Sequence, residues 1–182
     1  MYAKALLLAI PVLLTACAGE DMTTASPQTT EERDEVALAR SELLRADPNI
    51  GKFFREAYGY AIFPSVGKGG LVVGGARGEG WLYERGNLVG RAELNQVTVG
   101  AQAGGQGFTE VIFFRDEASI EKFKAGDLEL GASVGAVALK NQALANAGYD
   151  TGGMLVVVVG RGGLMVEASV GGQTFDYEPI GR

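Results

Sequence analysis

Short apolar segments that end at glycines dominate the chain from residue 58 onward. YAIF, GLVVGG, QVTVGAQ and FTEVIFF are examples, in which apolar residues run together or alternate. Glycine accounts for 28 of the 182 residues, roughly twice its usual share of about 7%, and it recurs as GG, GxG and GxxG without a collagen period. This pattern is typical of consecutive antiparallel strands joined by tight turns. We therefore expect one β-rich domain, because a chain of this length usually forms a single core.

Helical spacing of apolar residues occurs before these segments and once between them. A Thr followed three residues later by a Glu matches a capping box, and it predicts a helix over residues 31–46. Asp47, which precedes a proline, predicts the cap of a second helix that ends near Gly59. Asp116 predicts the start of one short helix over residues 116–125.

Several further elements follow from local signals. The segment ERGNLV predicts a hairpin turn at Gly86 and Asn87. Pro64 is expected at a strand end or at a sheet edge, because it has no backbone donor. Residues 127–139 are compatible with a strand or with a helix. The segments MLVVVV, LMVEASV and TFDYEP predict three more strands near the end of the chain.

The first thirty residues have the composition of a leader and a tether. Residues 1–16 have a basic start, an apolar centre and a small-residue exit, as signal peptides do. The next residue, Cys17, is the only cysteine, and LTAC resembles the bacterial lipobox, in which this cysteine carries acyl chains such as palmitate. The alternative is an ordinary signal peptide with an incidental cysteine. Residues 17–30 then read as the lipidated cysteine and a flexible tether, and residues 31–182 as the folded domain.

The residue types that most enzymes need are scarce in this chain. It contains no histidine, which removes the usual general base, Ser-His-Asp and Cys-His arrangements, and metal sites that contain histidine. The neighbouring acids Asp116 and Glu117, and the pair Asp127 and Glu129, have better explanations at a helix start and before an apolar run. A net charge of −6 disfavours nucleic-acid binding. We expect no catalytic residues, no metal and no cofactor.

One eight-residue segment occurs twice, as VGKGGLVV at 66–73 and as VGRGGLMV at 159–166. It lacks the residues of a Walker loop, and GxGxxG occurs nowhere in the chain. In one interpretation, each copy is a hairpin turn with an exposed cation at its tip. In the other, glycine-flanked amides and the adjacent cation bind an anion. The candidate lipid-binding residues on this second interpretation are Lys68, Arg161, Gly67, Gly69, Gly160 and Gly162.

Four long segments together resemble one family. They are YGYAIFPSVGKGGLVVGGARGEGWLYERGNLVG at 58–90, QVTVGAQAGGQGFTEVIFF at 96–114, FKAGDLELGASVGAVAL at 123–139 and GGMLVVVVGRGGLMVEASVGGQTFDYEP at 152–179. They are similar to the lipid-binding SYLF domain in its bacterial lipoprotein form. The resemblance implies an α+β domain with a strongly curled, barrel-like, largely antiparallel sheet and packed N-terminal helices. It also implies an adaptor that binds lipid and is not an enzyme.

Two functions are therefore expected from the sequence. The first is a lipid-binding module of the bacterial cell envelope that engages a phospholipid headgroup or another amphiphile. The second is a structural or protein-interaction module of the periplasm whose only lipid is its anchor. Ala18 follows the cysteine where an aspartate would favour the inner membrane, so we expect the anchor in the outer membrane and the domain in the periplasm.

Overall fold

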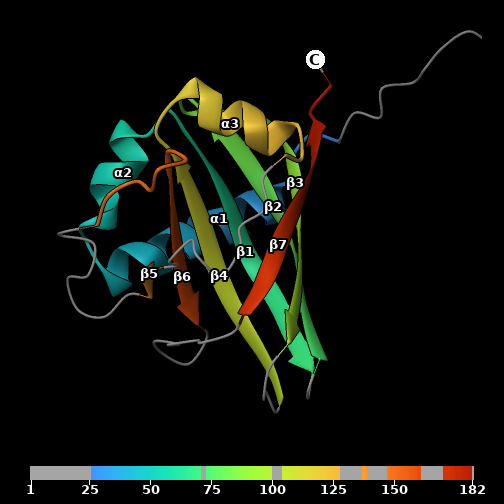
Figure 1. Ribbon diagram of the computed structural model, residues 1–182. Coiled ribbons are helices and arrows are strands. Elements are labelled where there is room, and N and C mark those ends of the chain that lie inside the picture. Colours follow the sequence, from blue (N-terminus) through green and yellow to red (C-terminus); the bar gives the residue numbers. More distant parts are fainter. Residues whose placement is uncertain are drawn as a thin grey trace, which may run out of the picture.

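The computed structural model describes residues 26–70, 73–99, 104–127, 137–138, 147–160 and 170–181. These residues form three helices and one seven-stranded sheet (Figure 1), so the predicted α+β class is confirmed. The helices are α1 (Thr30–Ala46), α2 (Ile50–Glu56) and α3 (Glu117–Lys124). The strands are β1 (Gly59–Gly70), β2 (Val73–Glu84), β3 (Asn87–Val99), β4 (Gly104–Phe114), β5 (Val137–Ala138), β6 (Met154–Gly160) and β7 (Val170–Pro179).

Side-chain caps determine where two of the helices begin. Before α1, the Thr29 hydroxyl accepts a hydrogen bond from the Glu32 amide at 3.2 Å, and the Glu32 carboxylate accepts one from the Thr29 amide at 2.7 Å. This is the predicted capping box. Asp116 caps α3 by accepting a hydrogen bond from the Ser119 amide, which confirms the third predicted helix.

The second helix starts later than predicted. Asp47 is not its N-cap, because α2 begins at Ile50 and Asn49 occupies the cap position. The Asp47 carboxylate instead accepts hydrogen bonds from the amide and the side chain of Asn49, at 2.9 and 2.8 Å. The buried aspartate thus stabilises the turn between the two helices rather than the end of the second one.

The sheet is antiparallel except at one short edge strand. Its order is β5-β6-β4-β1-β2-β3-β7, and only β5 is parallel to its neighbour β6. In the described part of the chain, no ladder joins β5 or β6 to β7, and the sheet is neither closed nor strongly curled. The largely antiparallel prediction is confirmed, and the strongly curled, barrel-like sheet is wrong. Consecutive hairpins place β1 to β3 side by side, but β4 returns to the other side of β1, which leaves β3 free to pair with β7.

The two faces of the sheet are covered by different helices. We call the face beneath α1 and α2 the outer face, and the opposite face, against which α3 packs, the inner face (Figure 1). Full burial of each large apolar side chain contributes about 1.5–3 kcal/mol. The outer-face core includes Leu43, Ile50, Phe53, Ile62, Phe113 and Leu155. The inner-face core includes Phe63, Leu94, Ile112, Phe114, Ile120, Phe123 and Phe175.

Glycines in β2 and β3 make room for aromatic rings on neighbouring strands. A Cβ at Gly80 would lie 2.4 Å from Cδ1 of Phe63, and a Cβ at Gly90 would lie 2.2 Å from Cε2 of Tyr177. Both distances are far shorter than a non-bonded contact between carbon atoms, which is about 3.5–4.0 Å. Part of the high glycine content therefore serves close packing within strands, in addition to the turns that the sequence predicted.

A β-bulge interrupts β1 at Pro64. The pairing with β2 shifts between Ile62 and Ser65, and the pairing with β4 shifts between Phe63 and Val66. The prediction that Pro64 lies at a strand end or an edge is wrong, because β1 is a central strand. The bulge removes the need for a backbone donor at this position, and the Thr109 hydroxyl donates a 3.0 Å hydrogen bond to the Pro64 carbonyl.

The remaining predicted elements differ in outcome. The turn between β2 and β3 lies at Arg85 and Gly86, one residue earlier than predicted, and both have positive φ, as a type I′ turn requires. The strands expected from MLVVVV and TFDYEP correspond to β6 and to part of β7. LMVEASV lies largely outside the described residues. Of residues 127–139, only Val137 and Ala138 are described as a strand.

Candidate functional site

Lys68 is not at a turn tip. It lies within β1, between the partners Ala76 of β2 and Gln106 of β4, and its side chain is buried on the inner face together with Val66. Burial lowers the pKa of its ammonium group. The prediction of an exposed cation is wrong, because β1 continues to Gly70 and its alternation after the bulge turns this side chain inward.

The glycines of the first repeat lie on the other side of the same strand. Gly67 and Gly69 are exposed within β1, and a Cβ at either would have no other atom within 4 Å. The first repeat does join two antiparallel strands, since β2 follows at Val73 and pairs with β1. Gly67 and Gly69 therefore belong to β1 and precede the connection to β2. They do not form an exposed turn tip with Lys68, because Lys68 is buried.

Only the first two residues of the second repeat, Val159 and Gly160, lie among the described residues. Gly160 is the last residue of β6, and β7 is the next described strand, but the two lie at opposite ends of the sheet order and do not pair. Arg161 and Gly162 lie outside the described residues, as does Cys17. The described residues of the two copies thus lie in β1 and in β6, and the predicted paired site at Lys68 and Arg161 falls partly outside the described residues.

A groove between α1 and the outer face brings two arginines together. This arginine groove has a volume of about 420 Å³. Arg33 and Arg40 lie about two helical turns apart on α1 and line one side of it. Neither arginine forms an ion pair with any described residue. The other lining residues are Val36, Ala37, Ser41 and Leu44 of α1, Tyr60 and Ile62 of β1, and Tyr83 and Gly86 of the β2–β3 hairpin.

Two stacked tyrosines line the opposite side of the arginine groove. The rings of Tyr60 and Tyr83 lie nearly parallel, with centroids 4.9 Å apart. Burial raises the pKa of Tyr83, whereas the hydrogen bond with Gln28 and the charges of Arg33 and Arg40 oppose that rise. Both guanidinium charges therefore act on the same phenol, which indicates that they converge on one part of the groove. The arrangement combines positive charge with an apolar wall.

The segment before α1 contacts this wall. The Tyr83 hydroxyl donates a 3.3 Å hydrogen bond to the Gln28 side-chain carbonyl, and Gln28 is buried although it precedes the first helix. Arg40 is also held in place, because its guanidinium lies 4.6 Å from the ring centre of Phe54 on α2. The groove is thus built from the helical layer, two strands and the residues that lead into the domain.

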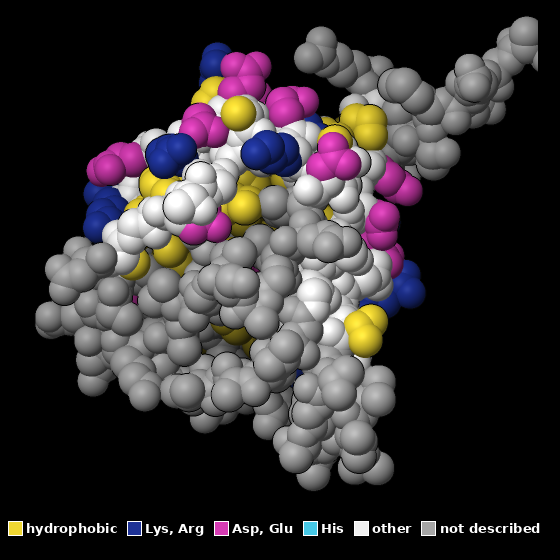
Figure 2. All heavy atoms as spheres, in the orientation of Figure 1, with side chains coloured by type: hydrophobic (Ala, Val, Ile, Leu, Met, Phe, Trp, Pro, Cys, Tyr) yellow, Lys and Arg dark blue, Asp and Glu magenta, His cyan; other side chains and the backbone are white. Residues whose placement is uncertain are grey.

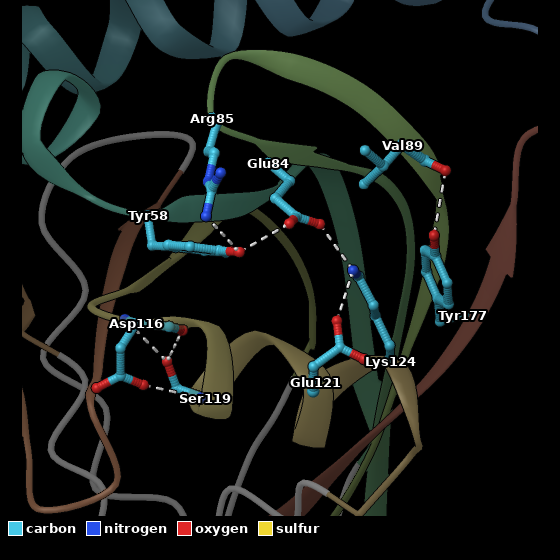
Figure 3. A network of polar contacts seen from close by, with 9 residues as sticks. All are labelled: Tyr58, Glu84, Arg85, Val89, Asp116, Ser119, Glu121, Lys124 and Tyr177. Atoms are coloured by element: carbon cyan, nitrogen blue, oxygen red, sulfur yellow. Dashed lines mark hydrogen bonds and ion pairs between the residues drawn. The ribbon is translucent and has the colours of Figure 1, made fainter.

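A second pocket lies on the inner side of the same hairpin, near the end of α3. Its volume is about 630 Å³. Lys124 bonds to Glu84 at 2.7 Å and to Glu121 at 2.8 Å (Figure 3), and these bonds outweigh burial and raise its pKa to about 12. Tyr58 donates to the other oxygen of Glu84 at 3.0 Å and accepts from Arg85 at 3.2 Å. The two cations and two carboxylates neutralise one another, so we interpret this network as a clamp that holds α3 on the sheet.

The described residues on the surface that Figure 2 shows form no large area of a single charge. Figure 2 shows Lys, Arg, Asp and Glu side chains intermixed over the end of the molecule that carries α2 and α3. Among the described residues, no three His, Cys, Asp or Glu side chains are grouped so that they could hold a metal ion. None of the described helices has the length and apolar composition needed to cross a membrane. The arginine groove is therefore the described site with the clearest ligand preference.

Sequence reasoning missed this groove. Arg33 and Arg40 belong to a segment that is acidic overall, and the tyrosines belong to two different strands. A signal was present in the helical pattern, because residues 33, 36, 37, 40 and 44 recur at spacings of three and four and therefore share one side of α1. That pattern shows the arginines next to apolar residues, but it does not show which strands lie opposite them.

The chain is similar to a curated protein over most of its length. No family model matches the chain. The chain is 31% identical over 144 residues to Beta cell expansion factor A of Aeromonas veronii, and the match covers 78% of this chain and 53% of that protein. The chain thus spans about half the length of the curated relative it matches.

Proposed function

We propose that the protein is a non-catalytic lipid-binding domain of the SYLF type, anchored through Cys17 at the bacterial outer membrane and facing the periplasm. The observation that carries this proposal is the arginine groove. Its two guanidinium groups lack carboxylate partners among the described residues and lie beside stacked tyrosines and aliphatic side chains. An anionic headgroup would bind the arginines, and the start of an acyl chain or another apolar body would lie against the wall.

The position of the groove supports binding to a membrane surface. Gln28, which lies near the end of the proposed tether, is packed against Tyr83 at the groove. A tether that is attached to the membrane at Cys17 would therefore bring the chain to the surface beside the groove. Ser26 lies nine positions after Cys17 in the sequence, a reach of at most about 32 Å when fully extended. Anionic lipid of the same membrane would then lie within reach of the arginines.

Vesicle sedimentation tests this proposal with the chain from Ala18 onward, which retains Gln28 and the cap at Thr29. We expect binding to vesicles that contain phosphatidylglycerol or cardiolipin, weaker binding to pure phosphatidylcholine, and a decrease with added salt. The double variant Arg33→Ala/Arg40→Ala should bind anionic vesicles about ten-fold more weakly, since charge-assisted hydrogen bonds contribute about 1.5–3 kcal/mol each before solvent screening.

The matched control is Arg45→Ala/Arg55→Ala. It removes the same charge from exposed positions on α1 and α2 that do not line the groove. It should retain most of the binding of the unaltered chain. Equal losses in both double variants would show that net charge, and not the groove, governs binding. No binding of the unaltered chain to any vesicle would instead favour a structural module whose only lipid is its anchor.

A further inference from the structure

Glu110 is a carboxyl group in an apolar part of the core. It lies in the middle of β4 on the inner face, is 0% exposed, and is opposite Phe63 of β1 and Val158 of β6. A buried carboxylate is costly unless hydrogen bonds or opposite charges compensate for the lost hydration. Burial raises the pKa of Glu110 to about 7, and a hydrogen bond from Gln173 opposes this rise. A large fraction of the Glu110 carboxyl groups is therefore protonated and uncharged near neutral pH.

The one hydrogen bond of this carboxyl reaches across the sheet. Nε2 of Gln173 on β7 donates to Oε2 of Glu110 at 3.0 Å, although β1, β2 and β3 separate β7 from β4 in the sheet order. Oε1 of Glu110 is buried and has no hydrogen-bond partner among the described residues. The only described ladder of β7 is with β3. The contact between Glu110 and Gln173 is therefore a polar tie between an edge strand and the centre of the inner face.

No described cation compensates for ionisation of Glu110. The titratable side chains that the described elements place on or beside the inner face are Lys68 of β1, Tyr177 of β7, and the network of Tyr58, Glu84, Arg85, Glu121 and Lys124 at the hairpin and α3. Lys124 is bonded to two other carboxylates, and burial raises the pKa of Tyr177 and keeps it neutral. Lys68 lies beyond Val66 along β1 and forms no ion pair with Glu110.

We infer that Glu110 and Gln173 form a proton-controlled latch that holds β7 on the inner face. The neutral carboxyl tolerates the apolar surroundings and keeps the bond to Gln173. The ionised carboxylate needs water or a cation at Oε1, and separation of β7 from the inner face provides access for water. The latch is therefore closed at low pH and opens more often as the pH rises through neutrality.

Opening would expose aromatic side chains. Phe175 lies next but one to Gln173 on β7, and its ring centre is 5.8 Å from that of Phe63 and 5.1 Å from that of Phe123. Separation of β7 would uncover these rings and offer an apolar surface to an amphiphile. This consequence rests on the proposed function, whereas the latch itself does not.

Native-state hydrogen exchange on the chain from Ala18 onward tests the latch. Protection factors, which correct for the intrinsic effect of pH on exchange, are measured at pH 6 and pH 8 for the amides of β7 and of β1. With a pKa of about 7 in the closed form and 4.5 in the open form, the opening equilibrium of β7 should rise about ten-fold over this interval. The amides of β1 should change much less, because β1 pairs on both sides.

Glu110→Gln is the decisive variant, because it keeps the size and the hydrogen-bonding capacity of the side chain but cannot ionise. It should remove the ten-fold change at β7. The control Glu178→Gln removes an exposed carboxylate from β7 itself and should leave the change intact. A pH-independent protection of β7 in the unaltered chain, or the same dependence in Glu110→Gln, would overturn the latch.

A second variant distinguishes the effect of the hydrogen bond from Gln173 from the effect of the charge on Glu110. Gln173→Leu removes the donor, so β7 protection should fall at both pH values while the dependence on pH persists. Unchanged protection at both values would also overturn the latch.

Vesicle binding is measured in parallel on the same samples. Loss of pH-dependent exchange with intact vesicle binding would reject the latch alone, and pH-dependent exchange without vesicle binding would reject only its link to lipid.

Discussion

Lys124 Nζ lies 2.7 Å from Glu84 Oε2, so a lysine of α3 is joined to a glutamate at the end of β2 that lies 40 residues earlier in the chain. Both side chains are mostly shielded from solvent, with exposed fractions of 20% and 23%. The hydrogen bond from Lys124 lowers the pKa of Glu84 below its usual value. This contact, together with the bond to Tyr58, connects the helix, the hairpin and the start of β1.

Replacement of Lys124 by methionine should destabilise the domain. The change keeps most of the aliphatic stem but leaves Glu84 without its cation, and we expect a loss of about 1 kcal/mol in the free energy of unfolding. Chemical denaturation at pH 7 measures it. Lys122→Met is the control, because Lys122 is exposed on the same helix and its side chain has no described partner. Equal effects of the two changes would contradict the role of the clamp.

The effect of Lys124→Met should also depend on pH. The pKa of Glu84 is lowered in the folded chain, so its contribution to stability is present above its unfolded pKa of about 4.5 and is lost as the pH falls through the folded value. The difference in stability between the unaltered chain and Lys124→Met should therefore shrink below pH 4.5. Denaturation series at pH 7, 5 and 3 measure this, and a constant difference would argue against an ionic contact.

Gly80→Ala should be among the most destabilising alanine substitutions in the sheet. The new Cβ would lie 2.4 Å from a ring carbon of Phe63 and 2.6 Å from the Ile62 carbonyl oxygen, so β1 or the ring must move. Forced insertion of a methyl group into a packed core costs about 1–3 kcal/mol. Gly67→Ala is the control, since its Cβ would have no atom within 4 Å. Thermal denaturation should separate the two variants by several degrees.

Thr29→Ala should weaken the start of α1. The variant loses the hydroxyl that accepts the Glu32 amide, and loss of such a cap costs about 1 kcal/mol. Thr30→Ala removes the same atoms from the adjacent, exposed first residue of the helix and should have a smaller effect. Circular dichroism during urea denaturation compares them. A larger loss for Thr30→Ala would contradict the capping role.

Cys17→Ser tests the anchor independently of the folded domain. A serine cannot form the thioether of a lipoprotein, so metabolic labelling with a palmitate analogue should be lost and the protein should leave the membrane fraction. Ser26→Ala, a change in the same segment that does not affect the cysteine, is the control. Labelling that persists in Cys17→Ser would show that the LTAC motif is not used.

Features that arise from residues close together in the sequence were predictable, whereas features that arise from residues far apart were not. The capping box at Thr29 and the cap at Asp116 arise from residues three positions apart, and both were predictable from the sequence. The pairing of β3 with β7 joins residues such as Leu94 and Phe175, far apart along the chain, and no local signal specifies it. The strand order, and with it the open shape of the sheet, depends on such long-range pairings, so local sequence patterns determine neither.

The candidate sites show the same limit. Lys68 stood out in the sequence because glycines surround it, and this neighbourhood suggested a turn. Tyr60 and Tyr83 gave no signal, because each occurs in an ordinary alternating strand and their stacking depends on the register of β1 against β2. The latch residues Glu110 and Gln173 likewise become neighbours only through the order of five strands.

The bulge at Pro64 reverses the parity of β1. Before it, odd-numbered residues such as Ala61 and Phe63 face inward; after it, even-numbered Val66 and Lys68 do. With the same number of residues but no bulge, odd-numbered residues would face inward along the whole strand, which would send Lys68 outward and Gly67 inward. The side on which this lysine lies is therefore determined by the two residues that the bulge places between Phe63 and Val66. We expect related chains to keep that number even where they change the proline.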